Sequence, residues 1–293
     1  MKIVSGPASK NLAERVSALS GFANVPVVFK VFPDGESYVR LDGSVLGEDV
    51  AIVQTTCPPG QDGRLFQLAF MADAAKRGGA KRVTAVVPYL AYARQDKMFL
   101  AGEGISVETV ARMLKVAGID NLVTVNIHSE PALKEFPFQA RTVSAIPLLT
   151  EYFVQKGHDG AFALSPDKGA MYIAEQAQKI LGGDAGHLDK VRDRYTGQTV
   201  QSAEGLNVKD KTVIIFDDIV STGGTIVGAA KILREKGAKH VFCACVHALL
   251  IGDAEKRILD AGVEEIVGTD SVPGKVSKVS LAPLLGQELK AQE

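Results

Sequence analysis

Short apolar runs alternate with helical segments along the whole chain, and this alternation limits the folds open to it. Runs rich in β-branched residues read as strands, among them EDVAIVQTT (48–56), KTVIIFDD (211–218) and KHVFCACVH (239–247). Such nearly continuous apolar strands are typical of parallel sheets covered on both faces. Segments such as NLAERVSALSG (11–21) and TIVGAAKILREKG (225–237) repeat apolar residues every three or four positions and end in glycine. We therefore predict a doubly wound α/β fold.

An internal repeat is visible when the chain is compared with itself. At an offset of 119 residues, positions 105–128 fall on 224–247 with helix, C-terminal glycine, strand and terminal histidine in register. We interpret this as a duplication, in which the second copy has DDIVSTG ahead of its helix and the first has MFLAGEG. The length of 293 residues is enough for two domains of ordinary size.

Composition excludes several classes of protein. The net charge is −1, so we expect no general attraction to nucleic acid or to a membrane surface. The sequence shows no transmembrane run and no signal peptide, and we expect a cytoplasmic protein. Cys57, Cys243 and Cys245 are too few and too poorly spaced for a zinc site or a disulfide framework.

The stretch 212–237, TVIIFDDIVSTGGTIVGAAKILREKG, places two acids and a glycine-rich turn between a strand and a helix. Free main-chain N–H groups at a helix N-terminus suit a phosphate, whereas Asp217 and Asp218 would repel one and should face hydroxyls or a metal. A sugar phosphate with adjacent hydroxyls satisfies both demands. The competing interpretation is an acid pair before an ordinary Thr-capped helix. The residues of the predicted phosphate cradle are Ser221, Thr222, Gly223, Gly224 and Thr225.

This string resembles the ribose 5-phosphate loop shared by type I phosphoribosyltransferases and ribose-phosphate pyrophosphokinases. FPDGESYVR (32–40) and PYLAYARQDKMF (88–99) resemble signatures of the pyrophosphokinases alone, and the likeness covers essentially the whole chain. The resemblance implies two duplicated domains of type I phosphoribosyltransferase-like fold. It also implies transfer of a pyrophosphoryl group from ATP to the anomeric hydroxyl of ribose 5-phosphate. The products would be AMP and 5-phosphoribosyl 1-pyrophosphate (PRPP), which supplies nucleotide biosynthesis.

The same resemblance suggests how the chain is divided and assembled. We expect an N-terminal domain at 1–142, a C-terminal domain at 143–278 that carries the ribose 5-phosphate loop, and a tail at 279–293 that packs back on the first domain. In the family, the FPDGE loop reaches a nucleotide bound mainly by a neighbouring subunit. We therefore expect a homo-oligomer.

Several side chains in the two signatures suit a nucleotide. In FPDGE, Phe32 can stack on a base, and Asp34 and Glu36 can accept hydrogen bonds from an amino group or a ribose, although Pro-Asp-Gly is also strong turn chemistry. In YARQDK, the cations Arg94 and Lys97 can hold a polyphosphate. The amide of Gln95 offers both donors and an acceptor.

Two further residues are implicated by the family's metal site. His128 ends the run NLVTVNIH and matches a family histidine at the metal-bound triphosphate. Asp167, in SPDKG, resembles the family's second magnesium-site carboxylate. Mg²⁺ is the expected cofactor, because carboxylate and phosphoryl oxygens are the ligands it prefers.

The polar segment 182–211 interrupts the alternation and reads as a hairpin or a mobile loop. In LDKVRDR, Lys190 and Arg192 are two residues apart and share one face if this is a strand. They match the family's loop cations that close over the donor, and we expect them to be catalytic. Arg194 is interpreted as a solvated charge.

Departures from the family pattern lie near the ligand sites. Asn126 and Ser221 replace common aspartates, 168–172 replaces a Gly-Gly and basic stretch, and VHALL (246–250) replaces Thr-His-Gly. These departures allow two other interpretations. The enzyme could use a nucleotide donor other than ATP, or the chain could be a non-catalytic homologue that regulates an active enzyme. A PRPP-consuming phosphoribosyltransferase is a further alternative, although it needs neither pyrophosphokinase signature.

Overall fold

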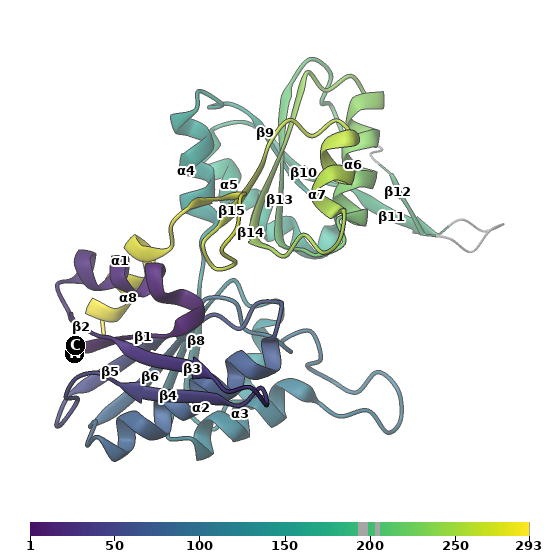
Figure 1. Cartoon of the computed structure of the whole chain (residues 1–293). Coiled ribbons are helices and arrows are strands. Elements are labelled where there is room, and N and C mark those ends of the chain that lie inside the picture. The colour runs from purple at the N-terminus through teal and green to yellow at the C-terminus, as the bar shows by residue number, and fades with distance from the viewer. Residues whose placement is uncertain (193–198, 203–205, 293) are drawn as a thin grey trace. The chain divides into compact units, whose positions relative to one another are not determined.

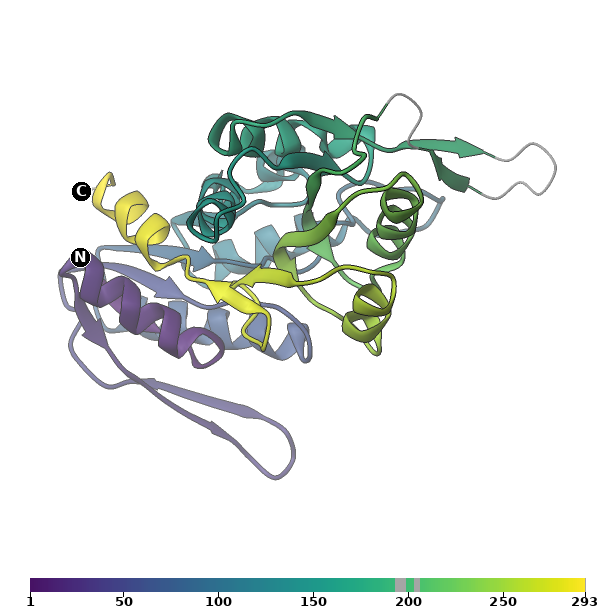
Figure 2. The same cartoon turned by 90° about the horizontal axis from the view of Figure 1, so that it is seen from above.

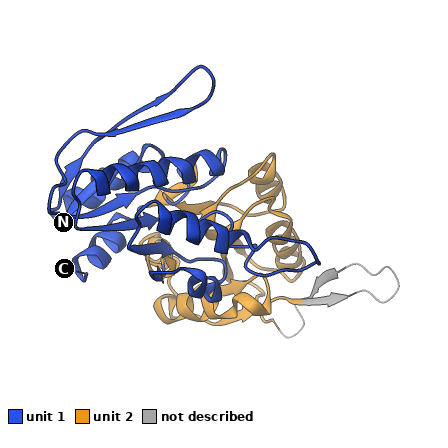
Figure 3. Ribbon diagram, turned by 90° about the horizontal axis from the view of Figure 1, so that it is seen from below, with its two compact units in different colours: residues 1–144, 271–273, 280–293 blue, residues 145–270, 274–279 orange. Residues whose placement is uncertain are grey.

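The computed structural model describes residues 1–192, 199–202 and 206–292, which form two compact units. The division is shown in Figure 3. The first unit comprises Met1–Ser144, Ser271–Pro273 and Ser280–Glu293, and the second comprises Ala145–Asp270 and Gly274–Val279. Each unit is built around its own hydrophobic core and its own parallel sheet. The predicted α/β class is confirmed.

The sheet of the first unit has the described strand order β2-β1-β5-β6-β7-β8, and every neighbouring pair is parallel. Its strands are β1 (Lys2–Ser5), β2 (Ala23–Val25), β5 (Asp49–Val53), β6 (Arg82–Val87), β7 (Asn121–Val125) and β8 (Gln139–Val143). Its helices are α1 (Lys10–Ser20), α2 (Gln61–Arg77), α3 (Ser106–Val116) and α8 (Ala282–Lys290), with short 3-10 turns η1 (Pro7–Ser9) and η2 (Glu130–Glu135). Figure 1 shows α1 and α8 on one face of this sheet and α2 and α3 on the other.

The sheet of the second unit has the described order β10-β9-β13-β14-β15-β16, again parallel throughout. Its strands are β9 (Phe162–Ser165), β10 (Ala185–His187), β13 (Thr212–Val220), β14 (His240–Ala248), β15 (Ile266–Thr269) and β16 (Ser277–Val279). Its helices are α4 (Ile146–Gln155), α5 (Met171–Leu181), α6 (Gly224–Glu235) and α7 (Ala254–Asp260), with the 3-10 turn η3 (Lys168–Ala170). Helices α4 and α5 contact each other, as do α6 and α7.

The hydrophobic pattern explains these elements. In α3 the buried residues Val107, Val110, Ala111 and Leu114 follow the three- and four-residue spacing of one helix face. The central strand β13 is instead buried without interruption from Val213 to Phe216, because helices cover both faces of a parallel sheet. The predicted strands and helices named above are confirmed, with ends that differ by a few residues.

Each unit also carries an antiparallel hairpin outside its sheet. In the first unit it is formed by β3 (Val27–Val31) and β4 (Ser37–Leu41), and in the second by β11 (Asp189–Arg192) and β12 (Thr199–Ser202). Both hairpins lie between the second and third strands of their unit's sheet in chain order. The expectation of a hairpin within 182–211 is thus confirmed for the described residues.

The duplication is real, but the predicted register of the repeat is wrong. An offset of 119 pairs β7 with β14, yet β7 is the fifth strand of its described sheet order and β14 is the fourth. Strand order and hairpin position instead make β5 and α2 the counterparts of β13 and α6. The counterpart of the DDIVSTG turn is therefore the segment after β5, residues 54–60, and not MFLAGEG.

The last helix closes the first unit. Helix α8 packs along α1, as Figure 2 also shows, and the Arg141 guanidinium donates to the Glu288 carboxylate at 3.0 Å. A helix long and apolar enough to span a bilayer is not found among the described residues.

Candidate functional site

The turn between β13 and α6 lies at the carboxyl end of the second unit's sheet, where open parallel sheets bind ligands. Strand β13 ends at Val220 and helix α6 begins at Gly224. Gly223 precedes the helix with a left-handed backbone, φ 76°. The leucine–isoleucine segment after β14 braces the turn: the N–H of Ile251 donates to the Ser221 carbonyl at 3.0 Å.

The main-chain N–H groups of this turn are available to a ligand. Within the described residues, the structure gives no acceptor for the N–H groups of Thr222, Gly223, Gly224 or Thr225. Helix α6 has no side-chain cap at its N-terminus, so the interpretation of an ordinary Thr-capped helix is wrong. Thr222, Gly224 and Thr225 are exposed. Unpaired donors at the positive end of a helix dipole form a site for an anion.

The two glycines of the turn have different roles. A Cβ on Gly223 would lie 2.8 Å from Cδ1 of Ile258 in α7, so this glycine is required by packing as well as by its backbone angle. A Cβ on Gly224 would meet nothing within 4 Å. Packing therefore does not require a glycine at position 224.

Asp217 and Asp218 lie inside β13 and not after its end. The strand continues because it pairs with β14, with Asp217 opposite Cys245 and Val220 opposite Ala248. Both aspartates are half-buried. The Asp217 carboxylate accepts from the Asp218 N–H at 2.9 Å, and burial followed by the charge of Asp218 raises the pKa of Asp217 well above its ordinary value.

Asp167 lies at the same edge of the sheet, because β9 is the parallel neighbour of β13. Its carboxylate accepts from the N–H of Ala170 at 3.2 Å and so caps η3. Its charge also contributes to raising the pKa of Asp217. No described cluster of three His, Cys, Asp or Glu side chains is placed to hold a metal ion by itself. Mg²⁺ fits such a sparse set, because it is commonly held by one or two carboxylates together with substrate phosphates.

The FPDGE residues form the tip of the β3–β4 hairpin in the first unit. The Phe32 N–H donates to the Glu36 carbonyl at 2.8 Å, and the Asp34 carboxylate accepts from the Glu36 N–H at 3.1 Å. Gly35 has φ 92°. The Phe32 ring is 45% exposed and meets Tyr38 edge-on, with ring centroids 6.3 Å apart. The hairpin thus presents an accessible aromatic ring beside two exposed acids.

The YARQDK residues lie in the connection between β6 and α3, at the carboxyl end of the first unit's sheet. Arg94 and Lys97 are exposed, and the Lys97 ammonium lies 5.2 Å from the centroid of the Phe99 ring. Gln95 is half-buried, and its amide donates to the Lys97 carbonyl and to Glu103 at 3.2 and 3.4 Å. The loop therefore holds Gln95 and leaves the two cations facing outward.

His128 does not end a strand as the sequence suggested. Strand β7 stops at Val125, and the chain turns through Asn126, whose φ is 36°. Asparagine is one of the few residues that tolerates this backbone region, so its presence is compatible with the turn. His128 is exposed beyond the turn, at the same sheet edge as the YARQDK loop, because β6 and β7 are parallel neighbours.

Lys190 and Arg192 lie in β11, on alternate positions that share one side of the strand. Their side chains lie outside the described part of the structure, as does the whole of Arg194.

Sequence analysis missed the segment 54–60, the first unit's counterpart of the turn between β13 and α6. Its polar side chains make internal hydrogen bonds: Gln54 accepts from the Ala8 N–H at 3.0 Å, and Thr56 accepts from the Ala91 N–H at 2.8 Å. Gln54 and Thr56 are fully buried. The N–H groups of Gly60, Gln61 and Asp62 at the start of α2 also have no acceptor among the described residues, so free main-chain donors occur in both copies, and the copies differ in the buried side chains of the first turn.

Comparisons with known proteins agree with this architecture. Residues 1–118 match the family described as the N-terminal domain of ribose phosphate pyrophosphokinase, and residues 157–283 match the phosphoribosyl transferase domain. The chain is 40% identical over 289 residues to a ribose-phosphate pyrophosphokinase of Methanothermobacter thermautotrophicus, covering 98% of this chain and 99% of the relative. It is 39% identical over 282 residues to one of Sulfolobus acidocaldarius, with 96% of each chain covered.

A solved structure has a similar fold. The phosphoribosylpyrophosphate synthetase of Mycobacterium smegmatis superposes with a TM-score of 0.87 and is 34% identical, covering 100% of this chain and 98% of its own.

Proposed function

The chain belongs to the ribose-phosphate pyrophosphokinase family, and from this membership we propose how its residues divide the work of PRPP synthesis. The enzyme transfers the pyrophosphoryl group of ATP to the anomeric hydroxyl of ribose 5-phosphate, giving PRPP and AMP. The bond between the β-phosphorus of ATP and the oxygen that bridges the α- and β-phosphates breaks. A new bond forms between the β-phosphorus and the anomeric oxygen of the sugar. The bridging oxygen leaves as part of AMP, and the proton of the anomeric hydroxyl passes to the solvent.

The ribose 5-phosphate site is the turn between β13 and α6. The observation that carries this proposal is the set of N–H groups from Thr222 to Thr225 that have no acceptor among the described residues. The sugar phosphate takes these donors at the positive end of α6. Asp217 and Asp218 accept from the ribose hydroxyls, so the acids and the phosphate lie at opposite ends of one ligand.

The nucleotide site is formed by groups of the first unit. Arg94 and Lys97 are cations that can pair with the triphosphate, and Gln95 supplies a neutral amide. Phe32 offers an exposed ring to the adenine base, with Asp34 and Glu36 beside it. Because Phe32 lies at the tip of a hairpin that extends from the sheet, the proposal includes a homo-oligomer in which this tip reaches a neighbour's nucleotide.

The metal is Mg²⁺, and we assign one ligand in each unit separately: His128 in the first unit at the triphosphate, and Asp167 in the second unit at a second magnesium site. When bound, it would neutralise charge on the phosphoryl oxygens. Asp167 is already oriented by its contact with the Ala170 N–H. Lys190 and Arg192 are the catalytic cations, which stabilise charge that develops on the β-phosphoryl group during transfer. The proposed domain division remains 1–142, 143–278 and the tail 279–293.

One assay tests the function. Purified protein is incubated with Mg²⁺, ATP and ribose 5-phosphate, and AMP and PRPP are measured. The proposal predicts equimolar formation of both products. No AMP with any nucleotide donor would favour the non-catalytic regulatory homologue, and pyrophosphate release from PRPP and a nucleobase would favour a phosphoribosyltransferase.

A further inference from the structure

A hydrogen bond joins the two segments of the first unit that carry the proposed triphosphate groups. The Ser129 hydroxyl donates to the Asp96 carboxylate at 2.5 Å, and both residues are half-buried. Asp96 lies between Gln95 and Lys97 in the loop after β6, and Ser129 directly follows His128 after β7. Asp96 and Ser129 can therefore affect the positions of the residues next to them in sequence without touching a substrate.

The segment of His128 is fixed on its other side by β8. The N–H of Asn126 donates to the Val143 carbonyl at 3.0 Å, and the N–H of Ile127 donates to the Thr142 hydroxyl at 3.1 Å. Ser129 therefore projects from a backbone that is already held at two successive positions. It offers the loop a rigid point of attachment.

The loop itself has no regular secondary structure, since residues 88–105 form turns and bends between β6 and α3. Its far end is closed by Glu103, whose carboxylate accepts from the N–H groups of Phe99 and Leu100 at 2.8 and 2.9 Å. The near end is held by the Ala91 N–H, which donates to the Thr56 hydroxyl at 2.8 Å, and the Gln95 carbonyl accepts from the Val107 N–H at 3.4 Å. The contact to Ser129 adds a tie to the His128 segment, and without it the exposed cations Arg94 and Lys97 would be less restrained. Ordering them on a ligand would then cost conformational entropy.

We propose that the hydrogen bond from Ser129 to Asp96 is a positioning contact, which sets the Arg94–Lys97 cations against His128 before the nucleotide binds. The inference rests on the proposed nucleotide site and names two residues that hold it in place. Asp96 and Ser129 are positioning residues and do not themselves touch the nucleotide.

Calorimetric titration with α,β-methylene-ATP, which cannot be cleaved at the transferred bond, tests the proposal. Ser129→Ala and Asp96→Ala should each weaken binding of this analogue by about tenfold, the range for loss of one hydrogen bond to a charged group. Ribose 5-phosphate affinity should not change. Asp96→Asn should stay within about threefold of wild type, because its amide oxygen still accepts from the Ser129 hydroxyl.

A double-mutant cycle separates positioning from general damage. The Asp96→Ala/Ser129→Ala variant should bind the analogue no more weakly than either single variant, because one contact is removed in all three. Arg112→Ala, which removes an exposed 2.9 Å ion pair with Glu108 on the following helix, is the matched control and should bind like wild type. If Asp96→Ala lowers the melting temperature, Ser129→Ala, which removes a single oxygen, still carries the test.

Wild-type affinity in Ser129→Ala, or fully additive losses in the cycle, would overturn the inference. Failure of the wild-type protein itself to bind the analogue or to form AMP would count against the proposed function instead. The two failures are therefore distinguishable.

Discussion

Gly60 and Gly223 are structural counterparts, each with a left-handed backbone immediately before the helix that follows the third strand of its sheet. Their φ angles are 85° and 76°. Both units therefore have the same strand–turn–helix geometry at this position. They differ in their side chains, because the first turn buries Gln54 and Thr56 in internal hydrogen bonds, whereas the second carries the half-buried Asp217 and Asp218.

Gly223→Ala should disrupt both stability and sugar-phosphate binding. A left-handed backbone costs a non-glycine residue about 1–2 kcal/mol, and the new Cβ would also lie 2.8 Å from Ile258. We expect a lower denaturation midpoint and loss of ribose 5-phosphate binding. Gly60→Ala is the matched control, since a Cβ there meets nothing within 4 Å. It should lose stability by strain alone and keep its sugar affinity.

Gly224→Ala should separate binding from stability. The new methyl group meets no protein atom within 4 Å, and replacing glycine by alanine at a compatible position stabilises a protein by about 0.4–1 kcal/mol, because the unfolded chain loses conformational freedom. We expect unchanged or higher stability, with ribose 5-phosphate affinity at least about tenfold weaker because the methyl group crowds the phosphate. Normal affinity in this variant would mean that the phosphate does not approach these N–H groups.

Asp218→Ala should weaken ribose 5-phosphate binding by about 10- to 100-fold, as expected for the loss of a hydrogen bond to a charged group. Nucleotide affinity, measured with α,β-methylene-ATP, should be unchanged. An equal loss for both ligands would contradict a role confined to the sugar.

Asp217→Asn should make the second unit more stable near neutral pH. Burial and the charge of Asp218 raise the folded-state pKa of Asp217, so the folded state binds the proton more tightly than the unfolded state. Stability is therefore greatest below the ordinary pKa and is lost as the pH rises through the raised value. Denaturation midpoints should fall with pH over this window in wild type, and the fall should be smaller in Asp217→Asn.

Lys190→Ala should depress turnover far more than substrate affinity. Loss of one group that stabilises transition-state charge typically costs about 10²–10³ in rate. Steady-state kinetics should show this loss in kcat with little change in the KM for ribose 5-phosphate. A variant with normal kcat and a raised sugar KM would instead place Lys190 in the sugar site.

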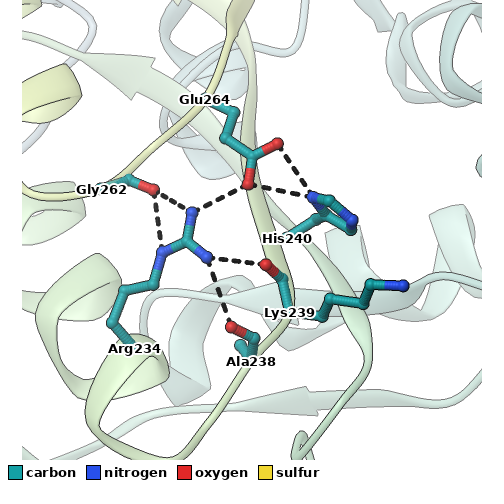
Figure 4. Close-up of polar contacts among 6 residues, drawn as sticks. All are labelled: Arg234, Ala238, Lys239, His240, Gly262 and Glu264. Atoms are coloured by element: carbon teal, nitrogen blue, oxygen red, sulfur yellow. Dashed lines mark hydrogen bonds and ion pairs between the residues drawn. The ribbon is translucent and has the colours of Figure 1, made fainter.

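Glu264→Gln should make the stability of the second unit less sensitive to acid. Burial alone would raise the pKa of Glu264, but hydrogen bonds from Arg234 and His240 outweigh it and hold the pKa below its usual value (Figure 4). A depressed folded-state pKa contributes stability that is present above the unfolded value and lost as the pH falls. Acid unfolding should therefore be shallower in the variant, and an unchanged profile would contradict this role.

The arrangement of the strands was largely predictable, because uninterrupted apolar runs such as Val213 to Phe216 occur only where both faces are covered. The repeat register was not, since every strand–helix pair of such a sheet has the same hydrophobic periodicity. Only the strand order shows that the counterpart of β7 in the second unit is β15 and not β14.

The site residues were found through motifs, but their exact placement needed the structure. The strand predicted as KTVIIFDD ends at Asp218 in the sequence analysis, whereas pairing with β14 extends it to Val220. The hydrogen bond between Asp96 and Ser129 joins positions 33 apart in sequence, and no local pattern marks it.

A crystal structure with ribose 5-phosphate tests the central claim most directly. The account predicts phosphate oxygens within about 2.7–3.2 Å of the main-chain nitrogens of Thr222 to Thr225, with the ribose hydroxyls on Asp217 and Asp218. A well-ordered sugar phosphate bound elsewhere, with these N–H groups left free, would contradict it.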